Sequence, residues 1–222
     1  EAFSTTPVKI TVANGGTVTA SSTSMCSPSG ASTLTVAGYE ANSYTWESAP
    51  NPVGPWSAIQ SNVASITVNN LTQTTYYRVN ANSGKAYSNT LTISIAVPTV
   101  AGSLTTPSQS VCSGDATVRT IALNGNTGSV NRWEYSNFNG EPWTALANTT
   151  TTLDFNNITQ TTWYRAVVQN GACTAEITPS IKVEVVNGGS VAGTTNICAN
   201  DGIIRTLVLS GHTGLINYWE RS

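Results

Sequence analysis

The feature that most constrains the fold of this 222-residue chain is that the sequence repeats itself. The stretch "LTQTTYYRV" at 71–79 returns as "ITQTTWYRA" at 158–166, 87 residues later. Three cysteines, Cys26, Cys112 and Cys198, stand 86 residues apart, and each is followed by a Trp-Glu pair 20 or 21 residues later. Self-similarity at a fixed period indicates a tandem array of domains, each with a core of its own.

The two ends of the sequence indicate where the repeats divide. "TPVKITVANGG" near the N-terminus matches "TPSIKVEVVNGG" at 178–189, which closes one repeat and opens the next. We therefore expect 1–12 to be the last strand of a preceding repeat, 13–98 and 99–186 to be complete repeats, and 187–222 to be part of a third. The chain is then a segment of a longer array.

The hydrophobic pattern alternates with a period of two and not of 3.6. Segments such as "TLTVAGY", "SITVNNL" and "TLTISIAV" are rich in Val, Ile and Thr, and clusters such as "SPSGAS" and "NFNGEP" lie between them. Several short strands at this spacing in a unit of under 100 residues are typical of an antiparallel sandwich. The sequence predicts an all-β protein of tandem immunoglobulin-like β-sandwich domains arranged end to end.

Aromatic landmarks of the immunoglobulin fold recur in each copy. A buried tryptophan on the third strand and a tyrosine near the start of the sixth, bonded through its hydroxyl to the preceding turn, are expected in such a sandwich. The residues predicted to fill these structural core positions are Trp46, Trp133, Trp219, Tyr77 and Tyr164.

The residues next to these aromatics face outward if the aromatics face inward. The third and sixth strands are neighbours in this fold, so Glu47 is expected opposite Arg78, and Glu134 opposite Arg165. Such cross-strand ion pairs contribute about 0.2–1 kcal/mol each. The residue types nearby offer no nucleophile or metal ligand, so a catalytic acid–base role for these pairs is disfavoured.

Four cysteines bear on the location of the protein. Cys112 and Cys173 belong to the same predicted sandwich, so the sequence predicts a Cys112–Cys173 disulfide and an oxidising location outside the cytoplasm. Ala86 occupies the position that matches Cys173 in the first repeat, which leaves Cys26 as a small buried hydrophobic residue without a partner. A partner of Cys198 would lie beyond the sequence.

The sequence offers no constellation that carries catalysis or a cofactor. His212 is the single histidine, the cysteines form no CxxC pair, and the repeat junctions carry no carboxylates for calcium. We expect no enzymatic activity, no metal and no cofactor. Only 9% of the residues are charged and the net charge is −2, which disfavours nucleic acid and anionic lipid as partners. No apolar run is long enough to insert into a membrane.

The remaining functional candidates are aromatic. Trp56 and Trp143 recur in register ten residues after the core tryptophans, and either ring offers a platform on which a sugar could stack. The alternative interpretation is that they are core or turn-covering residues. Trp163 and Tyr76 are more simply explained by packing over a cross-strand neighbour.

The phrases "GNTGSVNRWEYSNFNGEPWTAL", "NTTTTLDFNNITQTTWYRAVVQNGAC" and "GGSVAGTTNIC" resemble the Ig-like repeats of giant surface proteins of Bacteroidota. Mobile adhesins of gliding bacteria, exported through the type IX secretion system, carry such repeats. The resemblance covers essentially the whole chain, although the first repeat lacks the second cysteine. It implies display on the bacterial cell surface.

The expected function is that of a stalk segment of a large cell-surface adhesin, in surface attachment and, as the resemblance implies, gliding motility. Its partners would be neighbouring repeats of the same chain, while other parts of the protein bind extracellular polysaccharide or a solid surface. Two alternatives stay open: a carbohydrate-binding module with exposed aromatics, and spacer domains of a secreted polysaccharide-degrading enzyme.

Overall fold

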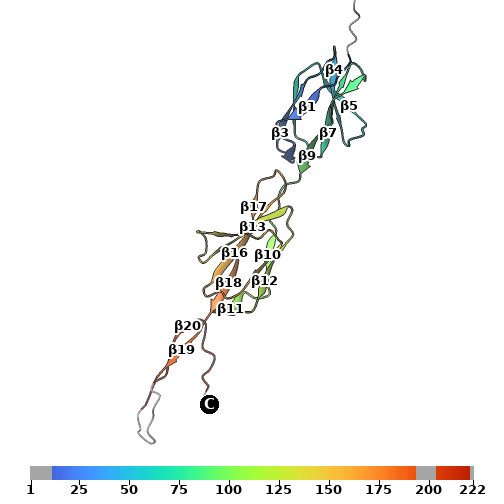
Figure 1. Ribbon diagram of the computed structural model, residues 1–222. Coiled ribbons are helices and arrows are strands. Elements are labelled where there is room, and N and C mark those ends of the chain that lie inside the picture. The colour runs from blue at the N-terminus through green and yellow to red at the C-terminus, as the bar shows by residue number, and fades with distance from the viewer. Residues whose placement is uncertain (1–11, 194–203, 221–222) are drawn as a thin grey trace, which may run out of the picture. The chain divides into compact units, whose positions relative to one another are not determined.

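A computed structural model describes residues 12–193 and 204–220 (Figure 1). The chain is all-β and divides into two compact units, so the predicted fold class is confirmed. Unit 1 comprises Glu1–Thr99 and Gln169–Ala175, and unit 2 comprises Val100–Val168 and Glu176–Ser222. The predicted N-terminal strand at 1–12 lies almost entirely outside the described residues. No described helix is long and apolar enough to cross a membrane.

Unit 1 is a sandwich of two sheets. The smaller sheet has the order β1-β3-β6, and the larger has the order β2-β9-β7-β4-β5, with β8 paired to β7. The strands are β1 (Thr17–Ala20), β2 (Ser24–Cys26), β3 (Ala31–Ala37), β4 (Tyr44–Ala49), β5 (Ser57–Ser61), β6 (Ser65–Asn69), β7 (Thr75–Ala81), β8 (Ala86–Tyr87) and β9 (Leu91–Ala96).

Unit 2 repeats this topology strand for strand. Its smaller sheet has the order β10-β12-β15, and its larger sheet has the order β11-β18-β16-β13-β14, with β17 paired to β16. The strands are β10 (Ser103–Thr105), β11 (Ser110–Cys112), β12 (Arg119–Asn124), β13 (Ser129–Ser136), β14 (Thr144–Leu146), β15 (Thr152–Phe155), β16 (Thr162–Gln169), β17 (Glu176–Ile177) and β18 (Ile181–Val186). A two-stranded sheet of β19 (Gly188–Ala192) and β20 (Val208–His212) follows.

The alternation seen in the sequence becomes the two faces of each strand. In β3, for example, Ser32, Leu34 and Val36 are buried and the residues between them are exposed. Each sandwich has a hydrophobic cluster of its own, formed where the inward residues of its two sheets pack against each other.

The two core tryptophans are confirmed. Trp46 and Trp133 are fully buried, and each indole Nε1 donates a hydrogen bond of 2.9 Å to a backbone carbonyl, that of Val63 or of Thr150 respectively. The hydrogen bond satisfies the one polar atom of the ring, so the rest of its surface is buried without an unpaired donor.

Two predictions about core aromatics need correction. Trp219 is 53% exposed and not buried, because the described part of 188–220 forms a single two-stranded sheet without a second layer to cover the ring. Tyr77 and Tyr164 are buried as predicted, but no described hydrogen bond joins either hydroxyl to the backbone of the preceding turn. Burial raises the pKa of Tyr164 to about 12, and the side chain of Thr162, at the start of the same strand, partly opposes this rise.

Candidate functional site

One disulfide lies within unit 1, and it is not the predicted one. Cys26 bonds to Cys173, with a sequence separation of 147 residues and Cα atoms 4.7 Å apart. Cys112 is a free, exposed cysteine, so the predicted Cys112–Cys173 disulfide is wrong. The prediction that Cys26 lacks a partner is wrong as well. Cys198 lies outside the described residues.

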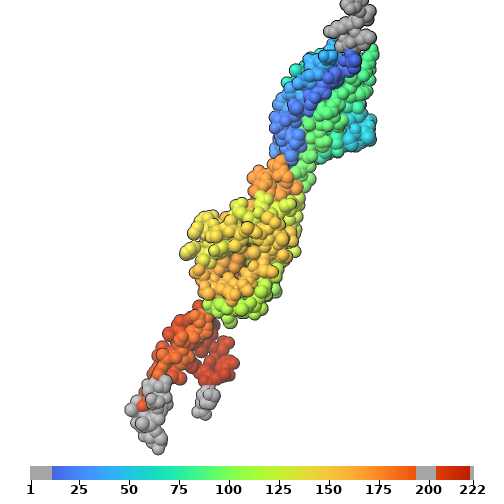
Figure 2. Space-filling view, in the orientation of Figure 1, coloured from blue at the N-terminus to red at the C-terminus, as the bar shows by residue number. Residues whose placement is uncertain are grey.

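The disulfide forms as it does because a loop of the second repeat belongs to unit 1. Gln169–Ala175 is part of unit 1, whereas the residues on either side of it, in β16 and β17, are part of unit 2. The backbone N–H of Asn170 donates to Thr99 Oγ1 (3.1 Å), and its Nδ2 donates to the carbonyl of Val97 (2.8 Å). Orange atoms of this segment are visible beside the end of unit 1 in Figure 2. These contacts place Cys173 next to Cys26, with which it forms the disulfide.

Gly171 allows the loop to approach this closely. Its φ is +54°, and a Cβ built on it would lie 3.0 Å from the Cβ of Ala96. The turn is closed by the N–H of Cys173, which donates to the carbonyl of Asn170 (3.0 Å). Residues with a side chain are strained at this φ, so glycine is the residue that fits.

The sequence contains a signal for this arrangement in the form of two matched insertions. In the first repeat Val79 N donates a hydrogen bond to Ser88 Oγ, and in the second repeat Ala166 N donates the corresponding bond to Thr178 Oγ1. The loop between the bonded residues is three residues longer in the second repeat. At the junction after the first repeat, three residues, 97–99, separate the end of β9 from Val100, which forms a bridge with Thr127. At the junction after the second repeat no such residues are inserted, because Asn187 directly follows β18. The longer loop and the longer junction are the two segments that bond to each other.

The predicted cross-strand ion pairs are confirmed on the outward face of each larger sheet. Arg78 Nε lies 2.8 Å from Glu47 Oε2, and Arg165 Nε lies 2.6 Å from Glu134 Oε2. Arg132 adds a second contact in unit 2, with its Nε 2.7 Å from Glu134 Oε1. Burial alone raises the pKa of Glu134, but hydrogen bonds from Arg165 and Arg132 outweigh burial, so the pKa lies below its ordinary value.

Trp56 and Trp143, the residues predicted as sugar platforms, each stack on one of these arginines. The guanidinium carbon of Arg78 lies 4.1 Å from the ring centre of Trp56, and that of Arg165 lies 3.9 Å from the ring centre of Trp143. Tyr87 covers Arg78 as well, also at 4.1 Å. One face of each tryptophan is therefore occupied by its own chain, and sugar contact at these rings stays a prediction.

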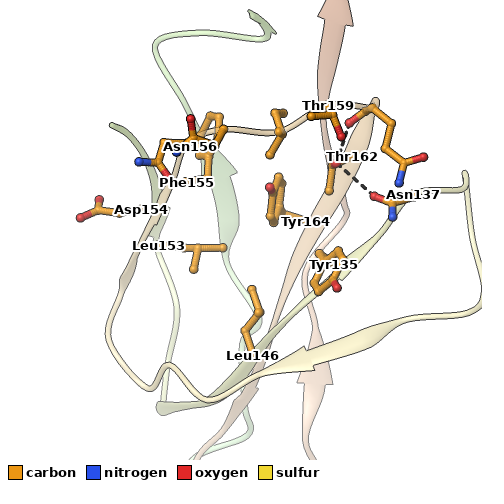
Figure 3. A pocket seen from close by; sticks show the side chains of 13 residues that line it. Tyr135, Asn137, Leu146, Leu153, Asp154, Phe155, Asn156, Thr159, Thr162 and Tyr164 are labelled. Carbon is orange, nitrogen blue, oxygen red and sulfur yellow. Dashed lines mark hydrogen bonds between the residues drawn. The ribbon is translucent and has the colours of Figure 1, made fainter. Parts of the chain in front are cut away.

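Unit 2 also contains a cavity of about 390 Å³ (Figure 3). Its apolar part is lined by Tyr135, Leu146, Leu153, Phe155, Ile158 and Tyr164. Its polar part is formed mainly by the amide side chains Asn137, Asn156, Asn157 and Gln160, together with Asp154, Thr159 and Thr162. Sequence reasoning missed this cavity, although the residues at which the two copies differ could have indicated it.

Within 12–193 and 204–220, no three His, Cys, Asp or Glu side chains group closely enough to hold a metal ion.

Comparison with known proteins gives a family and a fold. A family model described as "Domain of unknown function (DUF8696)" matches residues 14–97 and again 100–187. No curated protein matches the chain.

Solved structures similar to the chain include murine CEACAM1b, with 13% identity, a TM-score of 0.47, and coverage of 76% of this chain and 98% of that chain. A chain in the crystal structure of mouse coronavirus receptor-binding domain complexed with its murine receptor has 13% identity, a TM-score of 0.53 and the same coverage, 76% and 98%. The FN1–FN3 domains of chicken CNTN1 have 14% identity, a TM-score of 0.35, and coverage of 78% and 62%. At 13% identity, the likeness to the chain with a TM-score of 0.53 shows the fold alone. The disulfide is the feature that indicates an extracellular or cell-surface protein.

Proposed function

The chain belongs to the DUF8696 family, and we propose that its two tandem repeats are load-bearing, non-enzymatic segments in the stalk of a large bacterial cell-surface adhesin. The stalk would hold a distal binding region away from the cell envelope and transmit force to it. Neighbouring repeats of the same chain are its immediate partners, and polysaccharide or a solid surface is bound elsewhere in the protein.

The observation that carries this proposal is the Cys26–Cys173 disulfide. A pull on the two ends of the chain travels along the backbone to Cys26, crosses the disulfide to Cys173 and continues towards the C-terminus. Strands β3 to β9 of unit 1 and β10 to β16 of unit 2 lie inside the closed covalent loop. The disulfide therefore bears the main load within the two repeats, and most strands of both sandwiches are relieved of it.

The composition of the surface supports the same role. With 9% charged residues, the chain presents mostly Thr, Ser and Asn to water, which suits a stalk that does not attract other cells electrostatically. On the outward face, the arginines and glutamates bind one another in ion pairs, and the arginines stack on aromatic rings. These charged side chains therefore have a structural role. The resemblance to repeats of gliding adhesins supports attachment, gliding motility and type IX export as parts of this proposal.

Force spectroscopy tests the proposal directly. The full chain is held by handles at its two ends in an optical trap and stretched in the oxidised state and after reduction. The sequence separation of 147 between the cysteines corresponds to roughly 500 Å of extended chain at about 3.3–3.6 Å per residue. We expect this length to be absent from oxidised molecules and to appear after reduction.

The Cys26→Ala variant is the matched control, because it removes the bond without reductant. It should give the longer extension under all conditions, whereas Cys112→Ala should behave as the parent protein. An oxidised parent that releases the full length of both sandwiches at low force would contradict a load-bearing role for the disulfide.

A further inference from the structure

We propose that the cavity of the second repeat is a binding site for a neutral carbohydrate of one or two sugar rings. This site would add ligand binding to the mechanical role, and neither Trp56 nor Trp143 lines it.

The cavity lies at the edge of the sandwich of unit 2, beside the last strand of each sheet and next to the hydrophobic core. β14 is the last strand of the larger sheet and β15 is the last strand of the smaller one. β14 pairs with β13 over three residues, and Leu146 from β14 and Leu153 from β15 both line the cavity. Figure 3 shows Leu146, Leu153 and Tyr164 around the same open space. Leu153, Phe155 and Tyr164 are buried core residues, 6%, 7% and 5% exposed, so a ligand in the opening reaches the edge of the apolar core.

The fold itself does not require this lining, because the first repeat has the same topology with different residues. Tyr135 corresponds to Ser48 in the first repeat, Asn137 to Pro50 and Phe155 to Val68. Around these positions the copies agree: "NNLTQTT" at 69–75 matches "NNITQTT" at 156–162. The second repeat thus has two aromatic rings and an amide where the first repeat has Ser48, Val68 and Pro50, on a frame that the two repeats share.

The aromatic side chains suit the apolar face of a sugar ring. Tyr135 is half-buried at the wall of the cavity, and Phe155 and Tyr164 lie with their ring centres 5.6 Å apart beneath it. Aromatic rings with a polar edge favour ligands that are apolar on one side and hydroxylated on the other. No described hydrogen bond uses the Tyr135 hydroxyl.

The polar lining selects for a neutral ligand. Thr162 Oγ1 lies 2.9 Å from the carbonyl oxygen of Gln160 and 3.2 Å from Asn137 Oδ1, so its one proton is shared between these two acceptors, and the Asn137 Nδ2 has no partner among the described residues. The exposed side-chain amide of Gln160 has none there either. No Lys, Arg or His lines the cavity, and its one carboxylate, Asp154, accepts from Thr120 Oγ1 (2.6 Å). Amides both donate to and accept from hydroxyl groups, whereas an anionic ligand would find no countercharge.

The size of the cavity sets the size of the ligand. A volume of about 390 Å³ lies at the low end of the roughly 300–1,000 Å³ range of small-molecule pockets. One or two rings fit this space, and a longer chain would have to continue outside it.

The test is a titration of the full oxidised chain with four neutral probes: maltose, cellobiose, mannobiose and N,N′-diacetylchitobiose. Saturation-transfer NMR and calorimetry report binding, and we expect at least one probe to bind saturably with a Kd on the order of 1 mM or tighter. Tyr135→Ser and Phe155→Val, which restore the residues of the first repeat, should each weaken binding at least tenfold.

Two controls separate loss of the site from loss of the fold. Tyr87→Ser removes an exposed tyrosine of unit 1 and should leave the Kd unchanged, while amide exchange in β13 and β16 reports whether each cavity variant is folded. Asn137→Ala provides a second cavity variant that keeps the apolar lining. Absence of saturable binding by all four probes, or an unchanged Kd in Tyr135→Ser and Asn137→Ala, would overturn the proposal. The force-spectroscopy result is independent of either outcome.

Discussion

Glu134 and Arg165 face each other across β13 and β16, with Glu134 Oε2 2.6 Å from Arg165 Nε. The glutamate is 5% exposed, which makes it the one charged residue among the buried polar residues of the described chain. A carboxylate this deeply placed is stable only because Arg132 and Arg165 both donate to it. The corresponding Glu47 in unit 1 is bonded by one arginine and by Asn80.

The first prediction is that Glu134→Gln destabilises the second repeat by about 1–3 kcal/mol. The amide keeps the shape of the side chain but removes the charge that compensates two guanidinium groups. The expected loss lies at or below the lower end of the roughly 3–5 kcal/mol for a broken buried pair, because Arg165 is 19% exposed and water screens it. Amide exchange of β13 and β16 measures the free energy of local opening. Glu47→Gln is the matched variant in unit 1 and should cost less, and equal losses would contradict this ranking.

The second prediction concerns acid. Hydrogen bonds from the backbone of Thr117 and from Arg119 lower the pKa of Asp115 from 3.8 to about 2, and the pKa of Glu134 is also lowered from 4.5. A carboxyl group whose pKa is lower in the folded state stabilises the fold above its unfolded pKa and loses this contribution as the pH falls through the folded pKa. Unit 2 should therefore lose stability from about pH 4.5 down to about pH 2.

Urea unfolding at pH 5, 3.5 and 2.5, followed by near-ultraviolet circular dichroism and by amide exchange in unit 2, measures this loss. The Asp115→Asn variant should be less stable than the parent at pH 5 and should show a flatter dependence on pH. A variant whose profile runs parallel to that of the parent would show that the Asp115–Arg119 pair does not contribute.

The third prediction distinguishes the two Arg–aromatic stacks. Trp143→Ala removes the ring stacked on Arg165 and should cost about 1–2 kcal/mol in unit 2. Trp56→Ala should cost less, because Tyr87 still covers the Arg78 guanidinium at 4.1 Å. Amide exchange in β16 and β7 gives both values, and the double variant Trp56→Ala/Tyr87→Ala should bring the loss in unit 1 level with that in unit 2.

The parts of the fold that could be predicted are those determined by short-range patterns. Alternation assigns the faces of β3 and β7, and the repeated spacing places Trp46 and Trp133 at equivalent depths. The ion pairs follow from the same logic, since an inward Trp46 sets the direction of Glu47, and an inward Tyr77 sets that of Arg78.

The disulfide could not be predicted in this way, because loop residues have no fixed period. The position of Cys173 in the repeat predicts that it lies in the same sandwich as Cys112. The additional residues of the loop carry it instead to Val97, Thr99 and Cys26 of unit 1. The cavity escaped prediction for a different reason: Tyr135 and Phe155 continue regular strand patterns, and only their comparison with Ser48 and Val68 sets them apart.

The last prediction is the reactivity of the cysteines. Cys112 occupies the same register on β11 that Cys26 occupies on β2: Cys26 pairs with Ala96 of β9, and Cys112 pairs with Val186 of β18. Without reductant, a maleimide should label Cys112, while Cys26 and Cys173 are recovered as one cross-linked peptide pair by mass spectrometry.

Reduction should make the thiols of Cys26 and Cys173 reactive in addition to that of Cys112, and lower the stability of unit 1 by about 2–5 kcal/mol, the usual contribution of a native disulfide. The Cys173→Ala variant should lose the same amount without reductant and free the Cys26 thiol for labelling. A peptide pair joining Cys112 to Cys173 in native material would contradict the connectivity and with it the force path through unit 1. Labelling of Cys26 at equal rates in the oxidised parent and in Cys173→Ala would mean that the disulfide does not form in the parent. A disulfide-bonded Cys26 has no thiol that can react with the maleimide.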